Sequence, residues 1–371
     1  MISPELRSAL AHATGSSPDQ LQIIPLAKGG LINHSFQLKN SVTEETWLLQ
    51  LLNTSIFKHP EDLADNYRQL YDFSLQAPRR LKIPAPLLFE NGSYLFADTQ
   101  GKTWRAMQWI GGTETLEKVQ NPEQAKDLAA TFASFTLALT SGFKPAQLKY
   151  TLPGFHDLSF RYQQFEQALA AAGKLRLEQA ATLSEEMKKR SFYCTFFEQV
   201  KGDPRQFPLR VMHHDAKISN ILFEEGSGKV WGPIDLDTVM PGYFFSDLGD
   251  MIRSLAGTID ETSNDLSLMA IKEDIYETLV NAYSAVMDNE WSEQEKKYRH
   301  ASGLLLVYMQ TLRFLSDHLN GDIYYKVDHP GQNLERALNQ FQLLIRLEEY
   351  IECRHPFSFE LPATGLLPPH R

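Results

Sequence analysis

The spacing of apolar residues changes near residue 110, and this change restricts the folds available to the chain. Before it, the apolar stretches are short, and "LQIIPLAKGGLINHSFQLKN" places Gly-Gly between two of them, which is a hairpin signal. One segment, "HPEDLADNYRQLYDFSL", has helical spacing instead. Later, helical spacing recurs near 121–140, 158–172, 176–201, 244–257, 264–288, 292–320 and 331–352, and only 210–240 interrupts it with β-type residues. The pattern predicts an α+β fold, with a small antiparallel-sheet lobe followed by a larger, mainly helical lobe.

The composition is that of an ordinary globular protein, and it argues against several functional classes. The 371 residues are 43% hydrophobic and 22% charged, so the chain can bury a large core without metals or disulfides. The net charge of −10 is carried entirely by residues 111–371, because residues 1–110 contain equal numbers of acidic and basic residues. An acidic body repels phosphates, so we expect no nucleic acid partner. Neither Cys194 nor Cys353 has zinc-site spacing.

The ends and apolar runs of the chain bear on its location. The opening "MISPELRSALAHATGSS" lacks the basic start and apolar run of a signal peptide. No apolar run approaches the roughly 18 residues that span a membrane. We therefore expect a cytoplasmic protein with reduced thiols and no membrane partner.

The segment "RVMHHDAKISNILFEEGSGKVWGPIDLDTVMPG", residues 210–242, has the residue types that phosphoryl transfer needs. That reaction requires a carboxylate at the acceptor hydroxyl and Mg²⁺ on the phosphates. Asp215 can accept or orient the hydroxyl proton. Asn220 and Asp235, the latter at the end of an apolar strand, offer the hard oxygen ligands that Mg²⁺ prefers. The alternative is a strand-rich piece of core whose polar groups are turn residues.

A β-rich lobe over residues 1–110, a hinge near 107–112 and a helical lobe over 113–371 form a bilobal, protein-kinase-like arrangement with ATP in the cleft. The motif "HHDAKISNILF…PIDLD" resembles that of the aminoglycoside phosphotransferase and choline kinase superfamily. The resemblance is closest to the N-acetylhexosamine 1-kinases and extends over about residues 20–345, through "WLLQLLNTSIFKHPEDL", "GFHDLSFRYQQF" and "RFLSDHLNGDIYYK" among other segments. It implies an ATP- and Mg²⁺-dependent kinase acting on the anomeric hydroxyl of an N-acetylhexosamine or a related sugar.

The resemblance also assigns roles around the motif. Asp215 would be the catalytic base, and Asn220 and Asp235 would be the metal ligands. Asp237 would bind a second metal ion or support the first ligands. Of the two histidines, His213 would brace the loop or be an ordinary core histidine, whereas we expect His214 to point toward solvent or substrate.

On the nucleotide side, Gly29 and Gly30 would fold over the phosphates, and backbone groups of Gln108 and Ile110 would bind adenine. Kinases usually place a lysine on the third strand to hold the phosphates, but this chain has Gln50 there. One hypothesis is that another cation compensates, with Arg68 on the following helix as the nearest candidate.

On the acceptor side, the resemblance implies sugar contacts from Arg313 and Tyr324. We interpret Asp317 and Asn320, which lie near them, as a structural helix end. The related sugar kinases have a histidine where this chain has Leu31, which weakens the assignment to N-acetylglucosamine itself. The acids of "DLGDMIRS", Asp247 and Asp250, would brace the catalytic loop, or else bind a cationic acceptor.

Two alternatives stay open at this stage. One is a kinase for an amino alcohol or an aminoglycoside, whose acceptor pocket would be acidic and aromatic. The other is a non-catalytic, nucleotide-binding pseudokinase, which only Gln50 favours.

Overall fold

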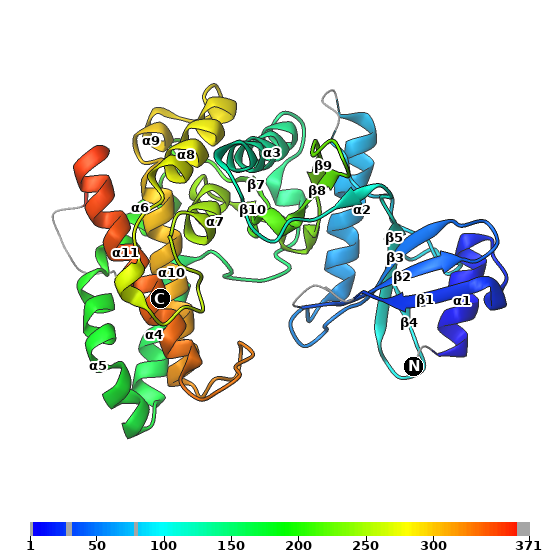
Figure 1. Cartoon of the computed structure of the whole chain (residues 1–371), viewed down its shortest axis with the longest axis horizontal. Coiled ribbons are helices and arrows are strands. Elements are labelled where there is room, and N and C mark those ends of the chain that lie inside the picture. The colour runs from blue at the N-terminus through cyan, green and yellow to red at the C-terminus, as the bar shows by residue number, and fades with distance from the viewer. Residues whose placement is uncertain (1–2, 27–31, 78–80, 362–371) are drawn as a thin grey trace. The chain divides into compact units, whose positions relative to one another are not determined.

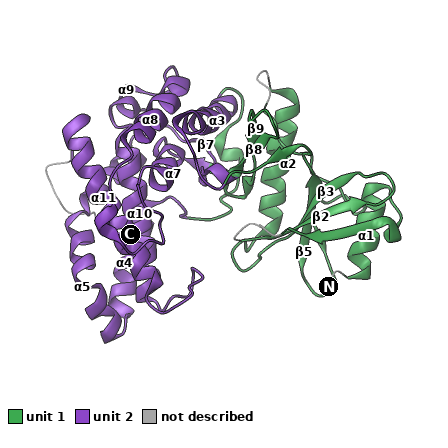
Figure 2. Ribbon diagram, viewed as in Figure 1, with its two compact units in different colours: residues 1–116, 141–153, 220–240 green, residues 117–140, 154–219, 241–371 purple. Residues whose placement is uncertain are grey.

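The computed structural model describes residues 3–26, 32–77 and 81–361 (Figure 1). The chain forms two compact units (Figure 2). Unit 1 comprises residues 1–116, 141–153 and 220–240, and unit 2 comprises residues 117–140, 154–219 and 241–371. The expected α+β class, an antiparallel sheet region followed by a mainly helical region, is confirmed.

Unit 1 is built on a five-stranded antiparallel sheet. Its order is β1 (Leu21–Pro25), β2 (His34–Asn40), β3 (Thr46–Leu51), β5 (Thr103–Gln108) and β4 (Phe96–Ala97). Helix α1 (Pro4–Thr14), which the sequence pattern did not indicate, packs on this sheet through apolar residues such as Leu6 and Leu10. Helix α2 (Pro60–Gln76) begins at a proline and coincides with the segment that was expected to be helical.

A second, three-stranded sheet in unit 1 carries part of the motif. Its order is β6 (Thr113–Glu114), β8 (Ile221–Glu224) and β9 (Val230–Pro233). Strands β8 and β9 form a hairpin in which Ile221 pairs with Pro233. Asn220 precedes Ile221 and Ile234 follows Pro233, so these two residues also lie opposite each other.

Unit 2 is arranged around helix α10 (Ala301–Leu319), which lies among its other helices (Figure 1). Nearly all of its residues are buried. A helix that is apolar on all sides belongs in the middle of a bundle. It packs against α11 (Gln332–Arg354), α7 (Phe245–Leu255), α4 (Leu158–Ala171) and α5 (Lys174–Lys189), while α3 (Pro122–Thr140) packs against α8 (Glu273–Met287). A Cβ added to Gly249 of α7 would lie 2.4 Å from the carbonyl oxygen of Ser302, so only glycine permits this approach.

The remaining elements of unit 2 are short. They are α6 (Phe192–Gly202), α9 (Glu293–Lys297), β7 (Arg210–Met212) and β10 (Met240–Gly242), of which β7 and β10 pair. Single 3₁₀ turns occur at Pro18–Gln20, Pro145–Gln147, Ile218–Asn220, Leu236–Thr238 and Leu266–Leu268. None of the helices in the described ranges is long and apolar enough to cross a membrane.

Two of the expected helices are each divided. The range 176–201 contains α5 and α6, which are separated at Arg190. Its guanidinium binds Glu348 of α11 at 2.9 Å and Glu186 of α5 at 2.7 Å, and this long-range contact is not visible in local spacing. The range 292–320 contains α9 and α10.

Strand β7, which leads into the motif, is anchored by a buried ion pair. The guanidinium of Arg210 binds both carboxylate oxygens of Glu295 and donates to the carbonyl oxygen of Glu290 at 2.7 Å. The side chains of Arg210 and Glu295 are only 4% and 0% exposed. Removing one partner of such a pair leaves an uncompensated buried charge, which destabilises a protein by about 3–5 kcal/mol.

We expect Glu295→Ala to lower the free energy of unfolding by about 3–5 kcal/mol, measured by urea unfolding followed by circular dichroism. Glu293→Ala on the same helix is the matched control, because the Glu293 side chain is 88% exposed, and its effect should stay within about 0.5 kcal/mol. Equal effects of the two substitutions would show that the buried pair is not an anchor.

Candidate active site

A buried carboxylate holds the backbone of the loop that contains Asp215. Asp247, at the start of α7 and fully buried, accepts the backbone N–H of His213 at 3.0 Å and that of His214 at 2.8 Å. His214 has φ +65°, a conformation that is uncommon for a residue with a side chain. The two hydrogen bonds therefore fix the direction in which the chain enters Asp215.

Asp215 is half-buried and lies beside a cation. The Nζ of Lys217 is 2.7 Å from its Oδ2, and the Lys217 N–H also donates to the Asp215 carbonyl oxygen at 3.0 Å. This pairs an acid suited to proton abstraction with a positive charge suited to an anionic group. The sequence prediction missed Lys217, although the Asp-x-Lys spacing in "HHDAKISN" was an available signal.

The two histidines before Asp215 are both buried. His213 packs edge-on against Phe132 and Phe135, with ring centroids 4.9 and 6.0 Å away, as expected of a core histidine. The expectation that His214 points toward solvent is wrong, because it is only 3% exposed. A Cβ added to Gly242 would lie 2.4 Å from its Nε2, so the glycine leaves space for this ring.

The two acids of α7 have different partners, one in the loop that contains Asp215 and one within α7 itself. Asp247 receives the two backbone bonds described above, and Asp250 binds the Nε of Arg253 at 2.9 Å. Arg253 also binds Glu261 at 2.8 Å. The bracing role expected for Asp247 is confirmed, and these contacts disfavour the alternative in which the two acids bind a cationic acceptor.

The expected metal ligands lie together at one end of the β8–β9 hairpin in unit 1. The Ile234 N–H donates to the Asn220 carbonyl oxygen at 2.9 Å, and Asp235 follows directly. Asp235 has φ +60° and is exposed, whereas Asn220 is buried. Left-handed backbone in a residue with a side chain is concentrated at functional sites. Among the described residues, no group of three or more His, Cys, Asp or Glu side chains is arranged to hold a metal ion. The candidate ligands at this hairpin are one amide and one carboxylate.

The neighbouring Asp237 is an anchor rather than a free ligand. Its Oδ1 accepts from Nη1 of Arg105 at 2.5 Å, and its Oδ2 accepts from Nη2 of Arg105 at 2.9 Å and from Nδ2 of Asn33 at 2.8 Å. All three side chains are less than 10% exposed. Of the two roles considered for Asp237, these contacts favour support of the metal-ligand turn over binding of a second metal ion.

Arg105 is also the cation beside Gln50. The two residues are paired across β3 and β5, and the Arg105 Nε donates to Gln50 Oε1 at 2.9 Å. Gln50 in turn donates to the Ser35 hydroxyl at 3.0 Å. Burial opposes the charge on Arg105, but Asp237 outweighs it, and the pKa of Arg105 is raised. The guanidinium therefore stays charged.

The hypothesis that Arg68 compensates for the missing lysine is not supported. Its side chain is 43% exposed, and it binds Asp65 at 2.8 Å and Asp72 at 3.3 Å, both on its own helix. Arg105, which the sequence prediction missed, takes the place next to Gln50 instead.

The structure describes only some of the other residues expected to bind the nucleotide. Gly29 and Gly30, together with Leu31, lie outside the described residues. The Gln108 N–H donates to the Ala85 carbonyl oxygen at 2.8 Å, and the Ile110 carbonyl oxygen accepts from the Thr113 hydroxyl at 2.7 Å.

In unit 2, a buried acid organises the turn that presents Tyr324. Asp317 Oδ1 accepts the N–H groups of Ile323 and Tyr324 at 3.0 and 2.8 Å, and its Oδ2 accepts that of Tyr325 at 2.9 Å. The structural role expected for Asp317 is therefore confirmed. Tyr324 itself is 54% exposed and can meet a ligand.

A continuous set of ring contacts connects Arg313 with the loop of Asp215. The Arg313 guanidinium lies 4.8 Å from the Phe155 ring centroid. Phe155 stacks on His156 at 4.8 Å, and His156 meets His214 edge-on at 4.9 Å. Burial holds the pKa of His156 well below its ordinary value, and the nearby positive groups act in the same direction. The side chains in this set of contacts are thus neutral or positive.

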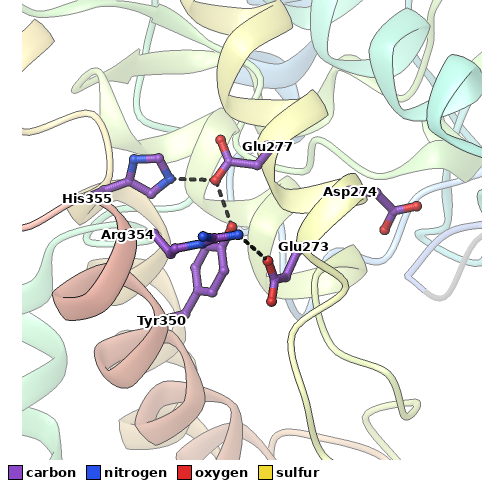
Figure 3. Close-up of a pocket in the computed structure, with 6 residues that line it drawn as sticks. All are labelled: Glu273, Asp274, Glu277, Tyr350, Arg354 and His355. Carbon is purple, nitrogen blue, oxygen red and sulfur yellow. Dashed lines mark hydrogen bonds and ion pairs between the residues drawn. The ribbon is translucent and has the colours of Figure 1, made fainter.

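Figure 3 shows a separate surface pocket of about 400 Å³ between the start of α8 and the end of α11. Two of its acids have partners within it, since Glu277 accepts from Tyr350 at 2.7 Å and Glu273 from Arg354 at 3.1 Å. It contains none of the expected site residues, and we interpret it as a helix junction.

Comparison with known proteins agrees with this geometry. A model of the phosphotransferase enzyme family matches residues 23–288. Among solved structures, the chain is similar to a microcompartment-associated aminopropanol kinase (14% identity, 94% of this chain and 97% of that chain, TM-score 0.58). It is also similar to an ethanolamine kinase of Plasmodium vivax (13%, 87% and 83%, 0.53) and to a choline kinase of Cryptosporidium parvum Iowa II (13%, 93% and 95%, 0.57). At these identities the likeness shows the fold alone, and it confirms the expected kinase-like class.

The brace at Asp247 has a pH signature. Burial raises the pKa of its carboxyl to about 7 from 3.8, although the two backbone donors lower it. The folded state keeps a proton that the unfolded chain has released above pH about 4. The contribution of Asp247 to the free energy of unfolding is therefore fully present below pH 4, and it is lost as the pH rises through 7.

We expect Asp247→Asn to remove this dependence. The difference in the free energy of unfolding between wild type and variant should change with pH between 4.5 and 7, by up to about 1.4 kcal/mol per pH unit. Urea unfolding at several pH values measures it. Asp288→Asn, at a side chain 68% exposed, is the control and should run parallel to the wild type. Parallel curves for Asp247→Asn would refute the raised pKa.

Proposed function

Since this chain belongs to the phosphotransferase enzyme family, we propose that it is a kinase that transfers a phosphoryl group from ATP, with Mg²⁺, to a hydroxyl of a small sugar. The acceptor is the anomeric hydroxyl of an N-acetylhexosamine or a related sugar. We keep the lobe boundary at the hinge near 107–112, with the nucleotide lobe before it and the acceptor lobe after it.

In this proposal Asp215 orients and deprotonates the acceptor hydroxyl. Asp247 holds the loop through two backbone hydrogen bonds, so Asp215 does not have to be reoriented during the reaction. Lys217, at 2.7 Å from Asp215, adds a positive charge next to the hydroxyl that attacks an anionic phosphoryl group.

Asn220 and Asp235 would hold Mg²⁺, and their oxygen donors at one hairpin end fit that ion. When bound, Mg²⁺ neutralises charge on the phosphates. For the nucleotide, Gly29 and Gly30 would cover the phosphates and Gln50 would hydrogen-bond to them. Backbone groups of Gln108 and Ile110 would contact adenine.

The observation that carries the choice of a sugar is the positive charge on the acceptor side. Arg313 lies on the ring of Phe155, in the set of contacts that leads to His214 and Asp215. A cationic amino alcohol or aminoglycoside would be repelled there. A sugar hydroxyl can accept hydrogen bonds from Arg313, and the exposed ring of Tyr324 can cover a sugar face.

The alternatives have less support. The amino-alcohol kinases named above share only the fold at 13–14% identity, and the acids that such an acceptor would need, Asp247 and Asp250, are engaged. A pseudokinase would require loss of the reactive groups, whereas Asp215, Asn220 and Asp235 are all present.

An ATP-consumption assay with Mg²⁺ over a panel of sugars and amino alcohols tests the proposal. We expect turnover with one or more N-acetylhexosamines and none with choline or ethanolamine. Turnover with the amino alcohols alone would replace the proposal with the first alternative, and no turnover with any acceptor would favour the second.

We expect Asp215→Asn to reduce kcat by about a thousandfold, since a general base contributes about 10²–10⁴. The KM for ATP should change little. Asp288→Asn is the control and should leave kcat at the wild-type value. Wild-type kcat in Asp215→Asn would remove this residue from the mechanism.

We expect Arg105 to orient Gln50 and the metal-ligand turn. Arg105→Met combined with Asp237→Leu replaces the buried pair with apolar groups, which keeps a fold stable in other proteins. The melting temperature should be retained, while kcat/KM for ATP falls about a hundredfold through lost orientation. Arg68→Ala is the control and should leave kcat/KM within twofold. A double variant with wild-type kcat/KM would exclude this role.

A further inference from the structure

Two arginines of unit 2 converge on Phe155. Arg313 of α10 places its guanidinium 4.8 Å from the ring centroid, and Arg161 of α4 donates from Nε and Nη2 to the backbone carbonyl oxygen at 3.3 and 3.2 Å. Tyr325 lies beside them, with its ring centroid 5.6 Å from the Arg313 guanidinium. Both arginine side chains are half-buried.

Neither arginine is ion-paired with a carboxylate in the part of the chain that the structure describes. Each donates to a neutral amide on its own helix instead: Arg313 to Gln310 at 3.0 Å, and Arg161 to Gln164 at 2.8 Å. The nearby carboxylate of Asp157 caps α4 and binds Lys201 at 3.4 Å. Other arginines, for example Arg190 with Glu348, form the carboxylate ion pair that is missing here.

The two positive charges repel each other, which is unfavourable without an anion. Burial, and then the positive charge of Arg313, lower the pKa of Arg161 to about 10. The rings of Phe155 and Tyr325 lie against the guanidinium of Arg313. Guanidinium forks match the planar, bidentate geometry of carboxylates and of other oxyanions.

We propose that Arg161 and Arg313 form a subsite for an anionic substituent, a carboxylate or a sulfate, on the sugar acceptor. This assignment rests on the proposed function and narrows it to acidic sugars. The subsite is connected to the loop of Asp215 through Phe155, His156 and His214. The exposed ring of Tyr324, 4.8 Å from that of Tyr325, is available for a sugar face.

Matched acceptors test the subsite. Glucuronic acid is compared with glucose, and N-acetylglucosamine 6-sulfate with N-acetylglucosamine, as the ratio of kcat/KM for the anionic member to that for the neutral one. For at least one pair we expect a ratio above ten, which decreases at high salt. Arg161→Gln should bring this ratio close to one, and Arg161→Lys, which keeps the charge, should restore part of it.

Arg205→Gln is the matched control, because it removes an exposed arginine of the same unit and should leave the ratio unchanged. Isothermal titration calorimetry with the same four sugars, without ATP, separates binding from turnover. We expect the favoured anionic sugar to bind, and Arg161→Gln to weaken its binding about tenfold.

Equal kcat/KM for both members of each pair, with neutral sugars phosphorylated, would overturn the subsite and leave the proposed function intact. A preference that persists in Arg161→Gln would likewise overturn it. If no sugar is phosphorylated, the proposed function fails, and calorimetry still decides the subsite: absence of binding by both anionic sugars excludes it.

Discussion

The two hydrogen bonds from the backbone of His213 and His214 to Asp247 are the interaction on which the candidate active site depends. They hold the chain in the uncommon left-handed conformation at His214, and the next residue is Asp215. The acid that receives them is fixed in turn, because Gly249 allows α7 to lie directly against α10. The position of the Asp215 carboxylate is therefore a consequence of helix packing in the core of unit 2. A buried carboxylate is suited to this role, because its oxygen atoms need hydrogen-bond donors and the two backbone N–H groups reach them in only one orientation of the loop.

In unit 1 a buried carboxylate also fixes a segment of the motif, but its donors are side chains instead of backbone N–H groups. The carboxylate of Asp237 is saturated by Arg105 and Asn33, and this anchors the turn that follows the hairpin strand and contains Asp235. The polar residues of the motif thus fall into two groups. Asp237, and Asp247 shortly after the motif, are engaged by contacts within the protein, and both are buried. Asp235 differs from them in being exposed. Residue type alone does not separate these groups, whereas burial does.

Local patterns in the sequence predicted what depends on local chemistry. The change from strand to helix spacing near residue 110 correctly indicated the fold class. The spacing of Asp215, Asn220 and Asp235 is also a local pattern, and the roles drawn from it stay predictions. What was missed depends on contacts between distant residues. Arg105 meets Gln50 only because strands β3 and β5 pair in one register, and Arg161 meets Arg313 only because α4 packs on α10. The break between α5 and α6 at Arg190 involves Glu348, far along the chain. His214 was expected toward solvent because its burial against His156 and Gly242 has no sequence signal.

The central claim is that a phosphotransferase fold has been given a positively charged acceptor side that selects a sugar over a cation. The most direct measurement is the position of the phosphate in the product, determined by ³¹P and ¹H nuclear magnetic resonance after incubation with ATP, Mg²⁺ and a mixture of N-acetylhexosamines and amino alcohols. The account predicts a phosphate coupled to the anomeric proton of a sugar. A phosphate on an amino alcohol, with the sugars unchanged, would contradict it.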